Sequence, residues 1–265
     1  MLAGAAIAVS GVLFQAVLKN PLADPGIIGI SSGASFTAVI ITAFAPTLYF
    51  FTPIAAFAGG VIAFFMVYCL SWKGGLSPMR IILTGVAVNS LFTGLSSALN
   101  SMSGGDRTGV AAIVEANITQ KTWDDVMTLL PYVIAGLFLA MLFTQECNLL
   151  SLEDKTARSL GVNVNVTRIV ISLVAVLLAS ISTAVAGAIS FLGLIVPHIG
   201  RILVGSDHKM LLPFSAVFGA FTFLLADTIG RTIAAPNEVS AAVIMSVVGG
   251  PFFILLLRRS GKYGK

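Results

Sequence analysis

The chain has 265 residues, of which 57% are apolar and only 10% charged, with a net charge of +4 and a mean hydropathy of +1.00. A water-soluble domain of this length needs about a quarter of its residues charged to cover its surface, so the composition excludes one. The chain is predicted to lie in a bilayer. Its small positive charge belongs to the loops and does not suggest nucleic acid as a partner.

Nine apolar segments are separated by Pro, Gly and charged residues, and each is predicted to form a helix in the membrane, where a span takes about 20 residues. In chain order they cover 1–18, 28–46, 53–72, 78–102, 126–146, 166–187, a short one at 190–204, 210–234 and 239–257. Pro46 and Pro53 bracket a turn in the uncharged run between Pro25 and Trp72. The predicted fold is therefore an all-α polytopic membrane protein, with one transmembrane domain over residues 1–265.

The first two segments are joined by "LKNPLADPGIIGISSG", residues 18–33. One interpretation is a plain turn, in which prolines stop the helices and Asp24 with Gly26 sets the reversal. The other is a pathway loop, because irregular backbone near the membrane is tolerated where protein or a water-filled cavity covers it. The G-x-S-x-G around Ser31 is typical of hydrolases only at a strand-to-helix turn. Here Ser31 and Ser32 are instead expected to cap the next helix.

Basic residues divide unequally between the two sets of loops that alternating segments create. Twelve fall in the set around 19–25, 73–80, 147–168, 201–209 and the tail from 258, against three in the other set. Cytoplasmic loops carry the excess of Lys and Arg, so the first set and the C-terminus are predicted to be cytoplasmic. Alternation then places Met1 outside, which suggests a missing N-terminal helix.

The longest polar stretch, residues 150–168, lies on the predicted cytoplasmic side. Ser151 with Asp154 resembles a capping box, and Gly161 is expected to end a helix of about two turns. Leu152, Ala157 and Leu160 would give that helix an apolar face for a soluble partner. The alternative is a solvated linker, which would not need such a face.

Ionisable residues inside the predicted spans are almost absent. Asp227 and Arg231 are spaced four apart and are interpreted as a salt bridge near the outer end of their helix. Cys69 and Cys147 are the only cysteines, too few for a zinc site or a disulfide framework. The absence of a buried carboxylate cluster argues against an ion-coupled secondary transporter, which is kept as the alternative function.

Several stretches together resemble the FecCD-type permeases, the membrane subunits of ABC importers for iron siderophores, haem and cobalamin. They are "GAAIAVSGVLFQAVLKNPLADPGIIGISSGA" (4–34), the segment from 150 to 162, "AGAISFLGLIVPHIGRILVGSDHKMLLP" (186–213), "LLADTIGR" (224–231) and "VVGGPFFILLLRR" (247–259). The resemblance runs over essentially the whole chain. It implies a type II ABC importer permease fold, for which ten helices are usual, so that the first appears to be lacking here.

The resemblance also implies partners. The permease would act as a homodimer or close heterodimer in the bacterial cytoplasmic membrane, with two cytoplasmic ATPases beneath it and an extracellular or periplasmic substrate-binding protein above. ATP would be bound by the ATPases, so this chain would be a transport subunit without catalytic residues, cofactor or metal of its own. Membrane lipid surrounds it. The phrase "VEANITQKTWDDV" (114–126) is similar to some Gram-positive haem permeases, which favours haem over siderophores or cobalamin.

Three groups of site residues are implied by the same resemblance. The inner gate or pathway takes Asn20, Pro21, Leu22, Pro78 and Met79, although Pro78 and Met79 replace small hydroxyl residues found in the cobalamin transporter. ATPase coupling takes Leu152, Glu153, Ala157, Arg158, Leu160 and Gly161, within a cytoplasmic coupling segment at 150–168. Docking of the binding protein takes Arg231, Arg107 and Lys121.

Overall fold

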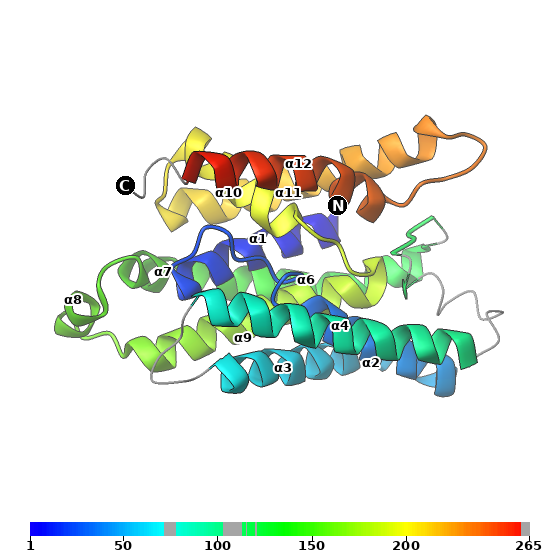
Figure 1. Cartoon of the computed structure of the whole chain (residues 1–265), viewed down its shortest axis with the longest axis horizontal. Helices are drawn as coiled ribbons and strands as arrows, with labels where there is room; N and C mark the ends of the chain where they lie inside the picture. Colours follow the sequence, from blue (N-terminus) through cyan, green and yellow to red (C-terminus); the bar gives the residue numbers. More distant parts are fainter. Residues whose placement is uncertain (72–77, 103–112, 115, 120, 261–265) are drawn as a thin grey trace.

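A computed structural model describes residues 1–71, 78–102, 113–114, 116–119 and 121–260, apart from the side chains at 78, 257, 259 and 260. The described residues are helical, with no strand among them (Figure 1). The elements are α1 (Leu2–Leu18), α2 (Ile30–Phe44), the 3₁₀ helix η1 (Pro46–Phe51), α3 (Thr52–Ser71), α4 (Pro78–Met102), α6 (Trp123–Leu142), α7 (Thr144–Leu150), α8 (Asp154–Ser159), α9 (Val164–Ala186), α10 (Leu192–Val204), α11 (His208–Ile233) and α12 (Ala241–Ser260).

Helix α1 is the centre of the bundle. It is buried on every side from Ala3 to Val17, and it packs against α9, α10, α11 and α6. Its sequence is apolar all round, the pattern of a helix with no face toward solvent. Small residues allow the close crossings: a Cβ on Gly4 would lie 2.5 Å from the carbonyl oxygen of Gly219 in α11.

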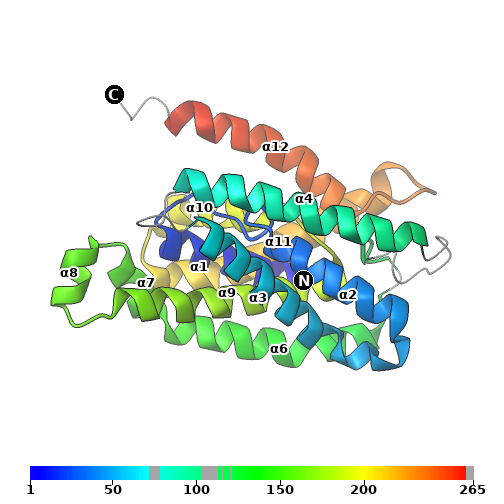
Figure 2. The ribbon, with the colours of Figure 1, turned by 60° about the horizontal axis from the view of Figure 1, so that its bottom comes forward.

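Helices α2 and α3 form an antiparallel hairpin, and η1 fills the turn that Pro46 begins. Gly33 and Gly59 meet at their crossing, where a Cβ on Gly33 would lie 2.7 Å from the Gly59 carbonyl oxygen. Helix α4 packs on this hairpin from one side only, as Figure 2 shows, and most of its surface stays open. Helix α12 is similarly peripheral and packs mainly on α11.

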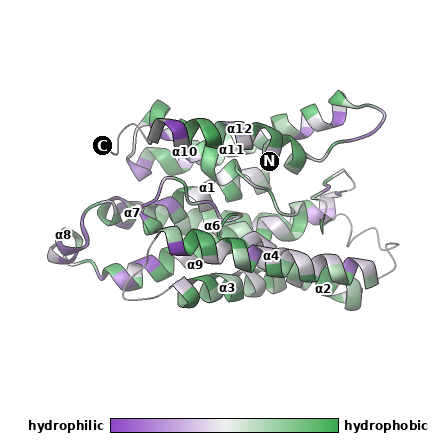
Figure 3. Cartoon of the chain, viewed as in Figure 1, coloured by the Kyte–Doolittle hydropathy of each residue, from purple (hydrophilic) through white to green (hydrophobic). Residues whose placement is uncertain are grey.

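The predicted segments are confirmed as helices. Five are long and apolar enough to cross a membrane, and the remaining four form the shorter apolar helices α1, α2, α10 and the apolar part of α12. The one substantial difference is that segment 126–146 divides at Phe143 into α6 and α7. The polar residues gather at the two ends of the bundle, and α7 and α8 lie at the same end as the last turn of α12 (Figure 3).

Candidate functional site

The loop between α1 and α2, residues 19–29, is called the gate loop below. Lys19 ends α1 in a left-handed conformation, with φ of 49°. Asn20 then accepts a hydrogen bond on Oδ1 from the backbone of Leu22 at 3.0 Å, the asparagine turn that its short amide favours. Pro21 is exposed while Asn20 and Leu22 are half-buried. The three predicted gate residues therefore form one tight turn at the end of α1.

Beyond Leu22 the gate loop turns inward, which a surface turn would not do. Ala23, Asp24 and Pro25 are buried, and Asp24 is fully so. Its Oδ1 accepts from the backbone of Gly26 at 2.8 Å, while Oδ2 faces the start of α10 beside Gly193 without an aligned partner. Burial raises the pKa of Asp24 to about 6, against the opposing effect of these backbone amides. Asp24 and Gly26 therefore form the predicted turn, but this half of the loop lies inside the protein.

The capping role predicted for Ser31 and Ser32 is wrong. Helix α2 begins at Ile30, after Gly29 in a left-handed conformation with φ of 88°. Both serines lie buried inside the first turn, and Ser32 donates its hydroxyl back to the Gly29 carbonyl at 2.8 Å. Neither hydroxyl is therefore presented as a nucleophile.

The structure brings the gate loop together with the start of α4. Asn20 and Leu22 share a cavity of about 10 Å³ with Ile81 and Ile82, about the space of one water molecule. Met79 lies in the same turn of α4 and is 68% exposed. The side chain of Pro78, the other predicted gate residue of this region, lies outside the described residues.

Helix α8 is the short helix predicted in the polar segment, but it begins later than predicted. Its N-cap is Glu153, without a side-chain cap, because Ser151 belongs to the end of α7 and donates to the Cys147 carbonyl. The predicted stop at Gly161 is correct: φ is +86°, and the amides of Gly161 and Val162 bond the carbonyls of Arg158 and Ala157. This pair of bonds is the Schellman motif.

The predicted coupling residues divide by exposure. Glu153, Arg158 and Gly161 are exposed, as are Leu152 and Leu160, at 40% and 59%. Ala157 is only 1% exposed because it packs against the chain itself. It cannot also contact a partner, so its predicted role in an apolar docking face is corrected to that of an anchor.

An ion-pair hub joins α8 to the gate loop, and sequence analysis missed it. Lys19 donates to the carbonyl of Leu152 and pairs with Asp154 Oδ1 at 2.7 Å, while Arg168 of α9 pairs with the same oxygen at 2.8 Å. The hydrogen bond from Lys19 lowers the pKa of Asp154, and Arg168 reinforces it. Leu152 and Asp154, the two partners of Lys19, lie 133 and 135 residues further along the chain, so no local pattern could signal the contact.

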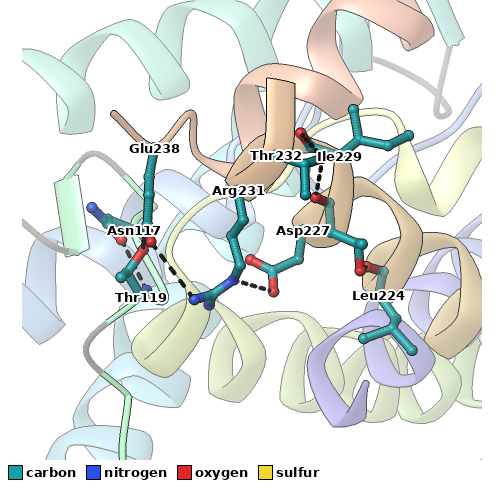
Figure 4. A network of polar contacts seen from close by, with 9 residues as sticks. Asn117, Thr119, Leu224, Asp227, Ile229, Arg231, Thr232 and Glu238 are labelled. Carbon is teal, nitrogen blue, oxygen red and sulfur yellow. Dashed lines mark hydrogen bonds and ion pairs between the residues drawn. The ribbon is translucent and has the colours of Figure 1, made fainter. Parts of the chain in front are cut away.

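At the opposite end, Arg231 belongs to an internal network (Figure 4). Its Nε pairs with Asp227 at 2.9 Å, as predicted, and its NH1 lies 4.0 Å from Glu238, which also accepts from Thr119. The Arg231 side chain is 39% exposed. Sequence analysis missed Glu238, whose loop folds back beside α11.

The other residues predicted for docking differ in their surroundings. Lys121 pairs with Asp125 at 3.5 Å, and Asp125 also accepts from Tyr49 and completes a capping box with Thr122. Arg107 lies outside the described residues. In the part of the chain that the structure describes, no group of three or more His, Cys, Asp or Glu side chains could hold a metal ion.

The chain is similar to known permeases over nearly its whole length. The chain is 41% identical over 260 residues to the "Probable heme-iron transport system permease protein IsdF" of Staphylococcus aureus, covering 98% of this chain and 79% of the relative. A solved inward-facing structure of a metal-chelate type ABC transporter superposes with a TM-score of 0.83 at 28% identity, over 97% of this chain and 84% of that one.

A more distant structure, PsaBC from Streptococcus pneumoniae, shares the fold with a TM-score of 0.62 at 19% identity, over 96% of this chain and 88% of that one. The predicted all-α permease fold is thereby confirmed. Residues 1–259 match the FecCD transport family, and the chain belongs to that family.

Proposed function

We propose that this chain is the membrane permease of an ABC importer that carries haem, or a closely similar iron chelate, into the cell. The observation that carries the proposal is the 41% identity to a haem-iron permease over nearly the whole chain. The likeness to a metal-chelate transporter supports the same substrate class. Substrate selection would rest mainly with a binding protein, because the described residues offer no ligand cluster for iron.

The permease would act as a dimer with the substrate passing between two copies. Helix α4 supports this because it carries a row of small and hydroxyl residues on an uncovered face: Ser90, Gly94, Ser97 and Ser101. Lipid gives such residues no partner, whereas a second helix or a water-filled passage does. Helix α12 also leaves a face uncovered, but the exposed residues on it are mostly large and apolar.

The end that carries α8 would face the cytoplasm and receive two ATPases. Leu152 and Leu160 are exposed on a short polar segment, where an apolar side chain gains free energy only by burial against a partner. The buried Ala157 and the ion pairs of Asp154 with Lys19 and Arg168 fix this segment on the permease, so a force on α8 would reach the bundle. A cysteine in place of Lys155 would then be labelled only by reagents that cross the membrane; labelling from outside contradicts the orientation.

The opposite end would receive the binding protein. Arg231 is the predicted contact, but it already has two carboxylates, so docking would require partner glutamates to compete with Glu238 and Asp227. The longer of these pairs, at 4.0 Å, is the easier one to exchange.

Reconstitution tests the proposal. The permease is placed in liposomes with its cognate ATPase and binding protein, and uptake of haem, a ferric siderophore and cobalamin is measured with and without ATP. We expect ATP-dependent uptake of haem. Uptake driven by a proton or sodium gradient without ATP contradicts the ABC role, whereas ATP-dependent uptake of only another substrate corrects the substrate alone.

A further inference from the structure

A polar cavity of about 320 Å³ opens at the α8 end of the molecule, between the gate loop, α7 and the turn from α10 to α11. We call it the Arg201 pocket. It is lined by Gln15, Lys19, Ser151, Arg201, Ser206 and His208, among others. Its walls thus include the end of α1 and the end of α7, immediately before the segment that leads into α8.

Arg201 is half-buried, and the one hydrogen-bond partner that it has among the described residues is neutral. Its NH1 donates to Gln15 Oε1 at 2.5 Å. Gln15 is buried, and its Nε2 donates to the carbonyls of Ala23 and Gly193, which fixes Oε1 toward the guanidinium. Among the described residues no carboxylate forms an ion pair with Arg201. A half-buried cation is costly without a counter-charge.

His208 also lines the pocket, and one of its two ring nitrogens lacks a partner among the described residues. The residue is only 4% exposed, its Nδ1 lies 2.7 Å from Asn148 Oδ1, and its Nε2 has no partner. Asn148 is held in this orientation because its Nδ2 donates to Asp207 at 2.7 Å. Oδ1 of Asn148 therefore accepts from Nδ1, so Nε2 of the neutral ring carries no proton and cannot donate to an anion in the pocket.

We propose that the Arg201 pocket receives the carboxylate of an acidic side chain from the ATPase that docks on this end, an inference that rests on the proposed function. In the part of the chain that the structure describes, Gln15 takes one donor of the Arg201 guanidinium, and the remaining donors match a carboxylate geometrically. Lys19 also lines the pocket, but its charge is already paired with Asp154. The pocket adjoins the α8 segment and the gate loop. Filling it would connect the ATPase directly to both.

Binding of the cognate ATPase to the full-length permease in detergent tests the proposal. We expect Arg201→Met to weaken binding about tenfold or more, since it removes one partner of an enclosed ion pair. Lys209→Met removes a nearby exposed cation and should change affinity less than about twofold. Arg201→Glu should be rescued by one Asp or Glu to Arg change on the ATPase.

A second variant separates a blocked pocket from a damaged fold. Ser206 is exposed on the turn between α10 and α11, so Ser206→Trp fills the pocket without altering Arg201 or its partner Gln15. It should weaken ATPase binding about tenfold, by loss of the same interaction, while Ser206→Ala binds like the wild type. Unchanged thermal unfolding of the permease alone shows that the fold is intact.

The outcomes distinguish the sources of the anion. If wild-type permease retains the ATPase and both Arg201→Met and Ser206→Trp retain it equally, the proposal is overturned. It is also overturned if Arg201→Met binds the ATPase normally but loses the rise in unfolding temperature that inorganic phosphate gives the wild type. The same holds if Arg201→Met binds the ATPase normally but no longer retains phosphatidylglycerol. If the wild type itself fails to retain the ATPase, the proposed function fails instead.

Discussion

Lys19 and Asp154 form an ion pair at 2.7 Å, and this pair ties the first residue of the gate loop to the first turn of α8. The Lys19 ammonium also holds the Leu152 carbonyl, so two points of the coupling segment are attached to one side chain. A displacement of α8 would be transmitted to Asn20 and Pro21 through this contact without passing through the membrane-spanning helices.

Lys19→Met should therefore uncouple transport. We expect substrate uptake per ATP hydrolysed to fall severalfold in proteoliposomes, while thermal unfolding hardly changes, because exposed ion pairs contribute about 0.2–1 kcal/mol. Arg168→Met is the matched control, since it removes a pair to the same Asp154 oxygen but does not touch the gate loop. Equal uncoupling by both variants would assign the effect to α8 stability.

The helices could be predicted from the sequence, whereas the contacts between distant loops could not. Apolar runs and prolines are local signals, so all nine segments were found. A "DPG" turn looks the same on a surface and inside a protein, which is why the burial of Asp24 escaped prediction. The link from Lys19 to Asp154 spans 135 residues and depends on how the bundle packs.

The start of α8 was misplaced for a different physical reason. Ser151 has the spacing of a capping residue, but α7 extends to Leu150, and its last turn offers the Ser151 hydroxyl a carbonyl acceptor at Cys147. A Ser or Thr hydroxyl at the end of a helix can bond the carbonyl four residues before it instead of capping the next helix. Because α7 extends to Leu150, the Ser151 hydroxyl bonds the Cys147 carbonyl and does not cap α8.

Asp24→Asn should change the pH dependence of stability. The pKa of the buried carboxyl is raised from 3.8 to about 6, so the folded state binds the proton more tightly than the unfolded state. Wild-type stability is then lost as pH rises from about 4 through about 6, by up to about 3 kcal/mol. We expect Asp24→Asn to lack this loss, measured as unfolding midpoints in detergent from acid to neutral pH. Parallel profiles would contradict the assignment.

Gly11→Ala should destabilise the crossing of α1 and α10. A Cβ at Gly11 would lie 2.0 Å from the carbonyl oxygen of Gly193, an overlap that only backbone movement relieves. The expected cost is about 1–3 kcal/mol or more. Gly94→Ala on α4 meets nothing within 4 Å and should gain about 0.5–1 kcal/mol in helix propensity. Thermal unfolding of the two variants should shift in opposite directions.

Leu160→Ala tests docking of the ATPase on the α8 end. The side chain is 59% exposed, so the unfolding free energy of the permease should change by less than about 0.5 kcal/mol. ATPase binding should lose about 1–3 kcal/mol if the leucine is a buried contact. Ile233→Ala, 68% exposed at the other end, is the control and should bind the ATPase normally. Normal binding by Leu160→Ala would favour the solvated linker.

In the network around Arg231, at the end of the bundle opposite α8, we expect substitutions of Arg231 and of Glu238 to have opposite effects on binding. If Arg231 docks the binding protein, Arg231→Gln should weaken binding in a salt-sensitive way, because exposed pairs are screened over about 8 Å at physiological ionic strength. Glu238→Gln removes an internal competitor 4.0 Å from NH1 and should tighten binding by up to about 1 kcal/mol.

Affinity of the binding protein for the permease in nanodiscs, measured at low and high salt, separates these effects. Asp227→Asn is the control for folding, since the 2.9 Å pair within α11 is the contact that a structural role of Arg231 would need. If Arg231→Gln and Asp227→Asn both lower the unfolding temperature of the permease but leave the affinity of the binding protein unchanged, the network is structural. Weaker binding for Glu238→Gln and normal binding for Arg231→Gln would instead make the carboxylate the docking group, with a basic patch on the partner.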